Sequence, residues 1–545
     1  MSSWLKKWEP ENPQFWKEEG SGRAWGTLSV TTFSLIASFA TWFVMSAVVV
    51  RLPQIGFKFD TMQLFWLAAM PGLSGGAMRT VHAFLIPIFG TRMTVTVATF
   101  IKLIPMVWLG LAVQNPETPY MHFLIISFLC GFGGGDFSSF MPSSSLFFPK
   151  RLQGTAMGLQ AGIGNLGVSI TQFVAPWIIG FAVIGAAGTP QLFTTATPVF
   201  DVKITKEAGV VKDVVVKGKL AEAMTVVKNE AGAVQDVIIA ETGATKGMKT
   251  EVKKNEAGVV TDLTVKKIVK KDIWLQNATL WYVPYLIIAG IICWIYLKSV
   301  PMKKPSIGKL VKDMTDNKHG YSMTWIYIMT FGSFSGFAAT FPLMIKIIYG
   351  NIPGADAALA PDPLKYAYLG PLVGSVIRFA GGPLSDKWGG SIFTMVSGGG
   401  IIVGCVALIF GGFLTPTSLD QFPMFVWIML WLFLMAGVGN FSTFRQFPIA
   451  YAYSPRMGAQ ILGWTGAWAA YGPFIFSSLM GSSISKYGSA VPFFVGVAAF
   501  CFIGSLLYWS FYTMTCAERG DWGTGKTWWD RISEAERQRY ISQNP

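Results

Sequence analysis

Two arginines, Arg79 and Arg378, lie inside stretches of the chain that are otherwise apolar or small. Arg79 precedes Gly90 by eleven residues, and Arg378 precedes Gly389 by the same interval. Eleven helical residues rise about 16 Å, which is roughly half the hydrocarbon thickness of a bilayer. A charge at that depth costs several kcal/mol unless it meets a polar cavity or a counter-ion, so a functional role is the default interpretation of both arginines.

Few acidic side chains are placed to neutralise these two charges. Within the apolar stretches only Asp136 is acidic, and Asp60 and Asp386 stand at their ends. The excess of positive charge favours an anion site over a structural ion pair. A guanidinium is planar and presents a fork of donors, so two of them facing each other would clamp a small planar anion from both sides.

The composition indicates that the chain spans a membrane, which is the environment assumed for these two arginines. Of 545 residues, 52% are hydrophobic and 13% are charged, whereas a soluble chain carries roughly a quarter charged residues. Apolar stretches long enough to span a bilayer as helices recur along the chain. The sequence therefore predicts an all-α polytopic membrane protein with twelve transmembrane helices, at residues 27–50, 62–89, 93–114, 120–146, 152–184, 278–299, 321–350, 364–384, 391–414, 422–447, 456–484 and 489–515.

The basic residues indicate the topology. The N-terminal segment is polar and has no small-residue cleavage site before a short apolar core, so we do not expect a cleaved signal peptide. Lysines and arginines concentrate in loops that lie on the same side as the termini, which predicts a multi-pass protein of the inner (plasma) membrane with both termini cytoplasmic. This pattern also explains the net charge of +14 without nucleic acid. The five scattered cysteines show no metal or disulfide spacing.

The chain repeats itself. The stretch GFGGGDFSSFMP (131–142) matches AGVGNFSTFRQFP (436–448), and the two arginines occupy matching second helices. Two six-helix halves with a substrate site between them are typical of transporters. The predicted organisation is a cytoplasmic segment 1–26, helices 1–5 in 27–194, an insert 195–272, helix 6 in 273–299, a cytoplasmic linker 300–320, helices 7–12 in 321–515 and a cytoplasmic tail 516–545.

The insert differs in composition from everything around it, being rich in Lys, Glu, Asp and Val. One phrase recurs three times, as KEAGVVKDV (206–214), KNEAGAVQDV (228–237) and KNEAGVVTDL (254–263). Valine-rich runs on either side of Glu-Ala-Gly predict β-hairpins with glycine at the turn. We expect a small extracytoplasmic β domain that acts as a spacer or contacts an unknown partner.

Longer motifs resemble a known family. GGPLSDKWGGS (381–391) resembles the loop motif of the major facilitator superfamily, in which Asp386 and Lys387 would be gating residues rather than substrate ligands. The first half, including GIGNLGVSITQ (162–172) in the fifth helix, resembles the nitrate/nitrite porter family of that superfamily. This resemblance resumes at LQNATLWYVP (275–284), directly after the insert.

The resemblance implies a role for ten positions. Arg79 and Arg378 match the paired substrate arginines of the family, and Asn165 matches its signature asparagine. Glycines of the fifth helix are expected to let helices approach closely. The implied substrate-binding residues are Arg79, Arg378, Asn165, Tyr327, Phe137 and Phe331, and the implied packing glycines are Gly158, Gly162, Gly164 and Gly167.

The sequence departs from the family at Asp136 and Arg445, where neutral residues are usual, and at Lys102, which we expect to snorkel toward the membrane surface. Asp136 and Arg445 have opposite signs, and they are the coupling candidates. If they pair, their charges cancel and the carrier needs an anion for every crossing. If Asp136 instead stays unpaired in a dry site, it is able to carry a proton.

Three functions follow. The leading hypothesis is a carrier that exchanges nitrate and nitrite by alternating access. The alternatives are a proton-coupled symporter of the same anions and, from another class, a membrane anion sensor whose external domain reads occupancy. Catalytic residues, metal ligands and cofactors are not expected, because the sequence holds no nucleophile–base pair and no ligand cluster.

Overall fold

The computed structural model describes residues 4–182, 188–198, 202–207, 209–216, 220–230, 232–242, 245–255, 258–301, 308, 318–350, 352, 360–450, 455–513 and 533–543. Most of the predicted linker 300–320 and of the predicted tail 516–545 lies outside the described residues.

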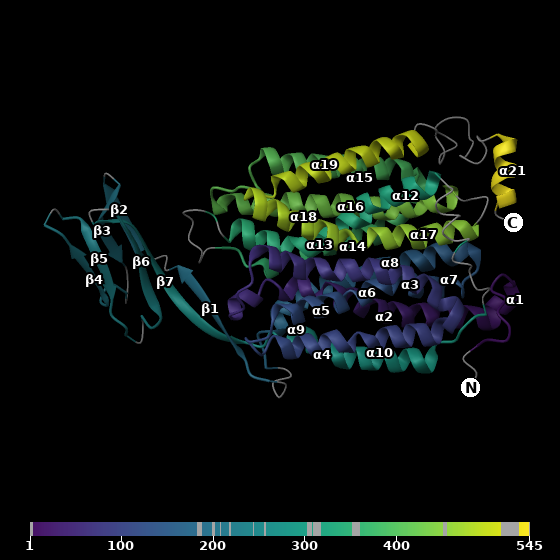
Figure 1. Ribbon diagram of the computed structural model, residues 1–545, viewed down its shortest axis with the longest axis horizontal. Coiled ribbons are helices and arrows are strands. Elements are labelled where there is room, and N and C mark those ends of the chain that lie inside the picture. Colours follow the sequence, from purple (N-terminus) through teal and green to yellow (C-terminus); the bar gives the residue numbers. More distant parts are fainter. Residues whose placement is uncertain are drawn as a thin grey trace.

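Helices form one long bundle, with the strands projecting from one end and both termini lying at the other (Figure 1). Among the described residues, eight helices are long and apolar enough to cross a membrane. The bundle also exposes large apolar side chains on its flanks, such as Phe410 (85% exposed) and Trp427 (69%), which fits a surface that faces lipid. The helices are α1 (Pro13–Phe15), η1 (Trp16–Gly20), α2 (Ser21–Val48), η2 (Leu52–Ile55), α3 (Thr61–Ile101), α4 (Leu103–Ala112), α5 (Tyr120–Cys130), α6 (Phe132–Gly135), α7 (Phe137–Ser145), α8 (Lys150–Ile178), α9 (Asn277–Leu280), α10 (Tyr282–Tyr296), α12 (Lys318–Tyr327), η5 (Ile328–Gly332), α13 (Ser333–Met344), η6 (Ile345–Tyr349), η8 (Pro363–Lys365), α14 (Leu369–Trp388), α15 (Gly390–Phe410), η9 (Leu419–Gln421), α16 (Phe422–Ala450), α17 (Pro455–Ala469), α18 (Gly472–Tyr487), α19 (Val491–Tyr508), η10 (Trp509–Thr513) and α21 (Glu534–Gln543).

The two glycines that the repeat singled out are both turning points. Gly90 has a φ of 77° and interrupts the helical geometry of α3, while Gly389 has a φ of 87° and separates α14 from α15. Residues other than glycine rarely adopt such positive φ angles. The predicted boundary between the helices at 62–89 and 93–114 is therefore confirmed, and the chain reverses at the same place in both copies of the repeat.

The two halves of the bundle pack along several helix pairs. Within the halves, α2 packs against α8 and α15 against α16; between them, α3 packs against α18, α8 against α14 and α2 against α13. Buried apolar side chains from both halves form one continuous core. Arg79 and Arg378 lie on α3 and α14, the two helices that make the principal contacts between the halves.

Polar contacts tie the halves together at the end that carries the strands. Both carboxylate oxygens of Asp362, which precedes η8, accept hydrogen bonds from Nη2 of Arg51, at 2.9 and 2.8 Å. Lys346 of η6 donates to the carbonyl of Val50 at 2.5 Å. The ring of Phe193, on the first strand of the insert, lies 5.2 Å from Cζ of Arg51. The bundle is thus closed by direct contacts at this end.

The insert is a β region whose strands run from Gln191 to Ile273, so it begins a few residues before the predicted 195–272. Strands β1 (Gln191–Pro198) and β7 (Val260–Ile273) form an antiparallel ladder that leads out of the bundle. Three hairpins follow the three repeated phrases, and their turn glycines Gly209, Gly232 and Gly258 have φ of 79°, 74° and 73°. The hairpin prediction is confirmed. The remaining strands are β2 (Val202–Glu207), β3 (Val210–Val216), β4 (Met224–Lys228), β5 (Val234–Ile239) and β6 (Met248–Lys254).

The three hairpins close into a ring with approximate threefold repetition. The lysine before each turn pairs with the aspartate of another hairpin: Lys206 with Asp262, Lys228 with Asp213 and Lys254 with Asp236. The hydrogen bond from Lys228 lowers the pKa of Asp213. Each repeat also contributes two side chains, at the second and fifth positions after its turn glycine, to one small apolar core: Val211, Val214, Val234, Val237, Val260 and Leu263.

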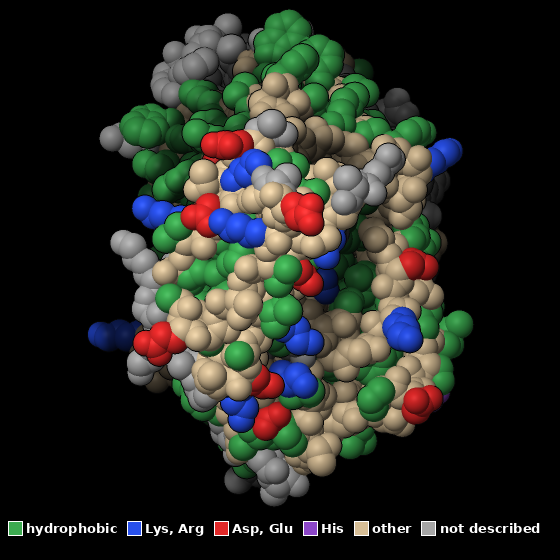
Figure 2. Space-filling model, turned by 90° about the vertical axis from the view of Figure 1, so that its left-hand side faces the viewer, with side chains coloured by type: hydrophobic (Ala, Val, Ile, Leu, Met, Phe, Trp, Pro, Cys, Tyr) green, Lys and Arg blue, Asp and Glu red, His purple; other side chains and the backbone are tan. Residues whose placement is uncertain are grey.

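The view onto the insert end shows Lys and Arg side chains interspersed with Asp and Glu, which matches these ion pairs (Figure 2). Because the hairpins have their own core and pair among themselves, they form a unit that depends little on the bundle.

We expect the hairpins to be removable. Replacing residues 199–265 with Asn-Gly would join Pro198 to Lys266, which face each other in the ladder, and would keep Phe193 in place. The anion exchange predicted from the sequence, measured in proteoliposomes, should stay within about twofold of the wild-type rate, since a turn replaces a self-contained unit. Loss of counterflow in correctly inserted protein would show that the hairpins take part in transport.

Candidate functional site

Arg79 lies in the middle of the bundle with none of its surface exposed. Its Nε donates to the carbonyl of Gly134 at 2.9 Å, and its Nη1 donates to the carbonyl of Gly466 on α17 at 2.6 Å. Its Nη2 has no hydrogen-bond partner among the described residues. Since an unsatisfied charged donor is costly in the interior, this nitrogen marks a position where an anionic oxygen would be stabilised.

Aromatic rings enclose the guanidinium and connect it to the second half. The Cζ atom of Arg79 lies 4.7 Å from the ring centroid of Phe137, 5.1 Å from that of Phe331 and 5.5 Å from that of Trp42. The Cζ atom of Arg378 lies 5.7 Å from the ring of the same Phe331. The structure therefore brings the two arginines to one aromatic ring.

Tyr327 completes this group. Its ring stacks on Phe331 with centroids 5.5 Å apart and an interplanar angle of 11°. Both rings belong to the seventh predicted helix, where α12 passes into the π-helical turn η5. Such turns are frequent at functional sites because they rotate the side chains that follow.

Asn165, on α8, is also fully buried. Neither the nitrogen nor the oxygen of its side-chain amide has a hydrogen-bond partner among the described residues. Buried amides are nearly always hydrogen-bonded, so this side chain is suited to meet a ligand that supplies an acceptor.

The signature glycines of α8 differ in what they do. A Cβ atom at Gly167 would lie 2.2 Å from the carbonyl oxygen of Ile36, and one at Gly164 would lie 2.7 Å from Leu35 Cδ2. Both glycines therefore allow α8 to approach α2, as predicted. A Cβ atom at Gly162 would lie 3.2 Å from Cβ of Phe379, which is closer than most contacts of real Cβ atoms. The packing role expected of Gly158 is wrong here, because a Cβ atom there would meet nothing within 4 Å.

The membrane acid Asp136 has a partner that the sequence did not suggest. Its Oδ2 accepts hydrogen bonds from the ammonium of Lys102 and from Ser38 Oγ, the latter at 2.6 Å. Lys102 has no exposed surface, so the expectation that it snorkels is wrong: an interior carboxylate holds it instead. The alternative in which Asp136 pairs with Arg445 falls on a side chain outside the described residues, and the side chains of Asp386 and Lys387 lie outside them too.

Sequence reasoning missed several other groups of the site. The carbonyls of Gly134 and Gly466 could not be assigned because backbone acceptors leave no mark in the sequence, although Gly134 lies in the repeated motif at 131–142. Trp42 faces Arg79 from α2, and its indole donates to the carbonyl of Pro71 at 2.8 Å. Among the described residues, no group of three or more His, Cys, Asp or Glu could hold a metal ion.

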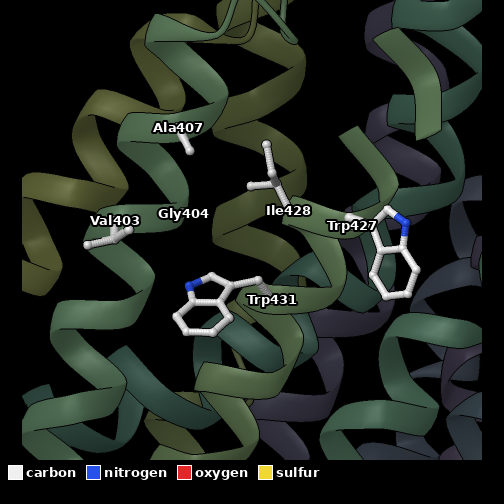
Figure 3. A pocket seen from close by; sticks show the side chains of 6 residues that line it. All are labelled: Val403, Gly404, Ala407, Trp427, Ile428 and Trp431. Carbon is white, nitrogen blue, oxygen red and sulfur yellow. The ribbon is translucent and has the colours of Figure 1, made fainter. Parts of the chain in front are cut away.

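One apolar hollow lies apart from these residues. It has a volume of about 230 Å³ between α15 and α16 and is lined by Val403, Gly404, Ala407, Trp427, Ile428 and Trp431 (Figure 3). Its walls include strongly exposed apolar side chains on the flank of the bundle. It offers no charge to an anion, so the arginine pair remains the candidate site.

The bundle and its interior arginines define a polytopic membrane protein of the major facilitator type. A bacterial homologue of the human lysosomal transporter Spinster, solved in an inward-facing and unoccupied conformation, superposes with a TM-score of 0.53 over 91% of this chain and 98% of its own, at 15% identity. That likeness shows the fold. No family model matches the chain.

Curated relatives show the family. The probable nitrate/nitrite antiporter NarK2 of Thermus thermophilus is 45% identical over 518 residues, which is 95% of this chain and 98% of the relative. The nitrate/nitrite transporter NarU of Escherichia coli (strain K12) is 31% identical over 530 residues, 93% of this chain and 96% of the relative. The chain belongs to the nitrate/nitrite porter (NarK/NarU) family of the major facilitator superfamily.

Proposed function

We propose that the protein carries nitrate and nitrite across the membrane in exchange for one another, with the anion held between Arg79 and Arg378. The observation that carries this proposal is that two buried guanidinium groups, one from each half, both lie against the Phe331 ring. The relatives named for nitrate and nitrite transport span nearly the whole chain, which supports the same substrates here.

The chemistry of the site fits these anions. Nitrate and nitrite are small, planar and singly charged, and a guanidinium offers parallel N–H donors to two oxygens of such an anion. Nη2 of Arg79 and the amide of Asn165 are buried donors without a partner in the described part of the chain. The rings of Phe137 and Phe331 supply flat apolar walls on which a planar anion can lie, as proposed from the family resemblance.

The charge balance favours exchange over proton symport. Lys102 cancels the charge of Asp136 within one buried pair, so this acid does not neutralise the buried guanidinium of Arg79. Reorienting that charge without an anion is costly in a medium of low polarity. A bound anion relieves this cost on each crossing. The symport alternative requires an unpaired acid, and Asp136 is engaged by an ammonium group.

The topology that goes with this function is the twelve-helix one. The eight long apolar helices include the run Thr61–Ala112, which turns back at Gly90 and so supplies two spans. Helices α8, α14 and the pair α17–α18 cross the bundle beside them and bring the number to twelve. With the termini in the cytoplasm, the insert lies on the extracytoplasmic side, and the closed end of the bundle faces outward.

Counterflow tests the function. Proteoliposomes loaded with nitrite should take up labelled nitrate, while empty liposomes should not, and a pH gradient should change neither result. Net uptake driven by the gradient without internal anion would decide for symport. Nitrate binding without any flux would decide for a sensor.

A further inference from the structure

A buried polar cluster adjoins the anion site within the first half of the bundle. Beyond the contacts of Asp136 with Lys102 and Ser38, Nδ1 of His82 lies 3.6 Å from Oδ1 of Asp136 and 2.8 Å from Oγ of Ser139. Each of these five side chains is at most 4% exposed. The cluster therefore joins α2, the first arm of α3, the junction between α3 and α4, and the break between α6 and α7.

This cluster adjoins two of the groups that contact the guanidinium of Arg79. Asp136 separates α6 from α7. Two residues before it, the carbonyl of Gly134 accepts the hydrogen bond from Arg79 Nε, and directly after it, Phe137 places its ring against Arg79. His82 follows Arg79 by one turn of the same helix. A shift of Asp136 would thus move two of the contacts that Arg79 makes in the first half.

The second half of the repeat lacks the cluster. Adding the interval of 299 residues that relates Arg79 to Arg378 places Gly381 at the position of His82 and Ile401 at that of Lys102. The matching GNF and GDF motifs place Asn440 at the position of Asp136. A bundle of the same architecture packs around these neutral residues, so the architecture does not require the charged cluster.

The exchange of His82 for glycine changes the space available to the neighbouring ring. In the second half a Cβ atom at Gly381 would lie only 2.1 Å from the ring of Phe441, the counterpart of Phe137. The ring of Phe441 therefore occupies space that any side chain at 381 would fill. In the first half His82 fills the equivalent space, and the ring of Phe137 lies on Arg79 instead.

We propose that Lys102, Asp136 and His82 are positioning residues that hold Phe137 and the Gly134 carbonyl against Arg79 and so fix the anion-binding guanidinium. This inference rests on the proposed function and adds to it the residues that orient one side of the site. Lys102 keeps Asp136 neutralised, Asp136 fixes the helix break, and His82 excludes the Phe137 ring from the place that its counterpart takes.

The test variants replace residues of the cluster with the residues that occupy the matching positions of the second half. Removing one charge alone leaves the other buried and unpaired, which strongly destabilises a protein, so Lys102→Ile and Asp136→Asn are combined. His82→Gly is the second variant, and it leaves the Lys102–Asp136 pair in place. Ser34→Ala is the matched control. It removes the 2.6 Å hydrogen bond between Ser34 on α2 and Thr99 on α3 and leaves the contacts of Asp136 in place.

Nitrate counterflow gives KM and the maximal rate, and thermal unfolding with and without nitrate gives the Tm shift on binding. We expect the double variant and His82→Gly to insert and to raise KM for nitrate about tenfold, in proportion to a lost cation–π contact, with a reduced nitrate-induced Tm shift. The maximal rate should fall less than KM rises. Ser34→Ala should leave KM and the shift as in wild type.

The outcomes separate this inference from the proposed function. Wild-type protein that shows neither counterflow nor a nitrate-induced Tm shift contradicts both. A functional wild type with an unchanged KM in His82→Gly overturns the positioning role, and so does an unchanged KM in the double variant, whose pair would then serve only to cancel charge. If the double variant fails to insert, His82→Gly decides alone.

Discussion

Replacing Arg79 with lysine should lower the rate of nitrate counterflow about 100-fold or more, although the charge is kept. The guanidinium uses Nε and Nη1 for the carbonyls of Gly134 and Gly466 and leaves Nη2 for the anion. The lysine ammonium is compact and tetrahedral. It cannot reach both carbonyls and still present a planar pair of donors to the anion, as the guanidinium does. Loss of a buried, hydrogen-bonded charge contact has effects of this size.

The measurement needs a control for the general effect of replacing arginine in α3. Arg92 lies on the same helix beyond Gly90, with Cζ 4.4 Å from the ring of Trp294, a contact that a lysine can keep. Arg92→Lys should therefore transport nearly as well as wild type, while Arg378→Lys should resemble Arg79→Lys. Near-normal counterflow by correctly inserted Arg79→Lys protein would rule out the two-arginine site.

Features with a local cause could be predicted from the sequence. Glycine at a turn with positive φ dictated the three hairpins and the reversals at Gly90 and Gly389. The depth of the two arginines followed from the fixed rise of a helix and from the repeat, and the structure brings both to Phe331. In each case a short stretch of chain contains its own physical reason.

Features that depend on how helices rotate against each other could not be predicted. Hydropathy gives the depth of Lys102 but not the direction in which it points, so the snorkelling expectation missed the carboxylate of Asp136 on a neighbouring helix. Pairing among the hairpins is similar: the repeats predict each hairpin, but the ring of ion pairs exists only once all three have packed. Gly158 shows the converse, since membership of a glycine motif does not by itself place a neighbour against the residue.

Replacing Asp362 with asparagine should open the end of the bundle that carries the insert. Alternating access requires the two halves to separate there, and the Arg51–Asp362 pair is one of the contacts that must break. Arg51 is 6% exposed, and both oxygens of Asp362 accept from its Nη2. Hydrogen bonds to charged groups contribute about 1.5–3 kcal/mol, so their loss should shift the equilibrium toward the open state about tenfold or more.

A cysteine at Ala338 reports this opening. Ala338 is fully buried on α13, and its carbonyl accepts a hydrogen bond from Gln172 of the other half at 2.9 Å. In detergent, a polar thiol reagent should modify Ala338→Cys about tenfold faster when Asp362→Asn is added, and nitrate should alter this rate. Asp420→Asn is the control, because Asp420 is an exposed acid that accepts a hydrogen bond from Ser418 and lies within η9.

Phe193→Ala extends the same test to the insert. Its ring covers Arg51 from β1, so its removal should speed the labelling of Ala338→Cys by a smaller factor than Asp362→Asn does, about threefold for the loss of one cation–π contact. Labelling that is unchanged by Asp362→Asn would mean that the ion pair does not hold this end closed. Labelling that responds to Asp362→Asn but not to Phe193→Ala would mean that the Arg51–Asp362 pair alone holds this end closed and that the insert takes no part in the conformational cycle.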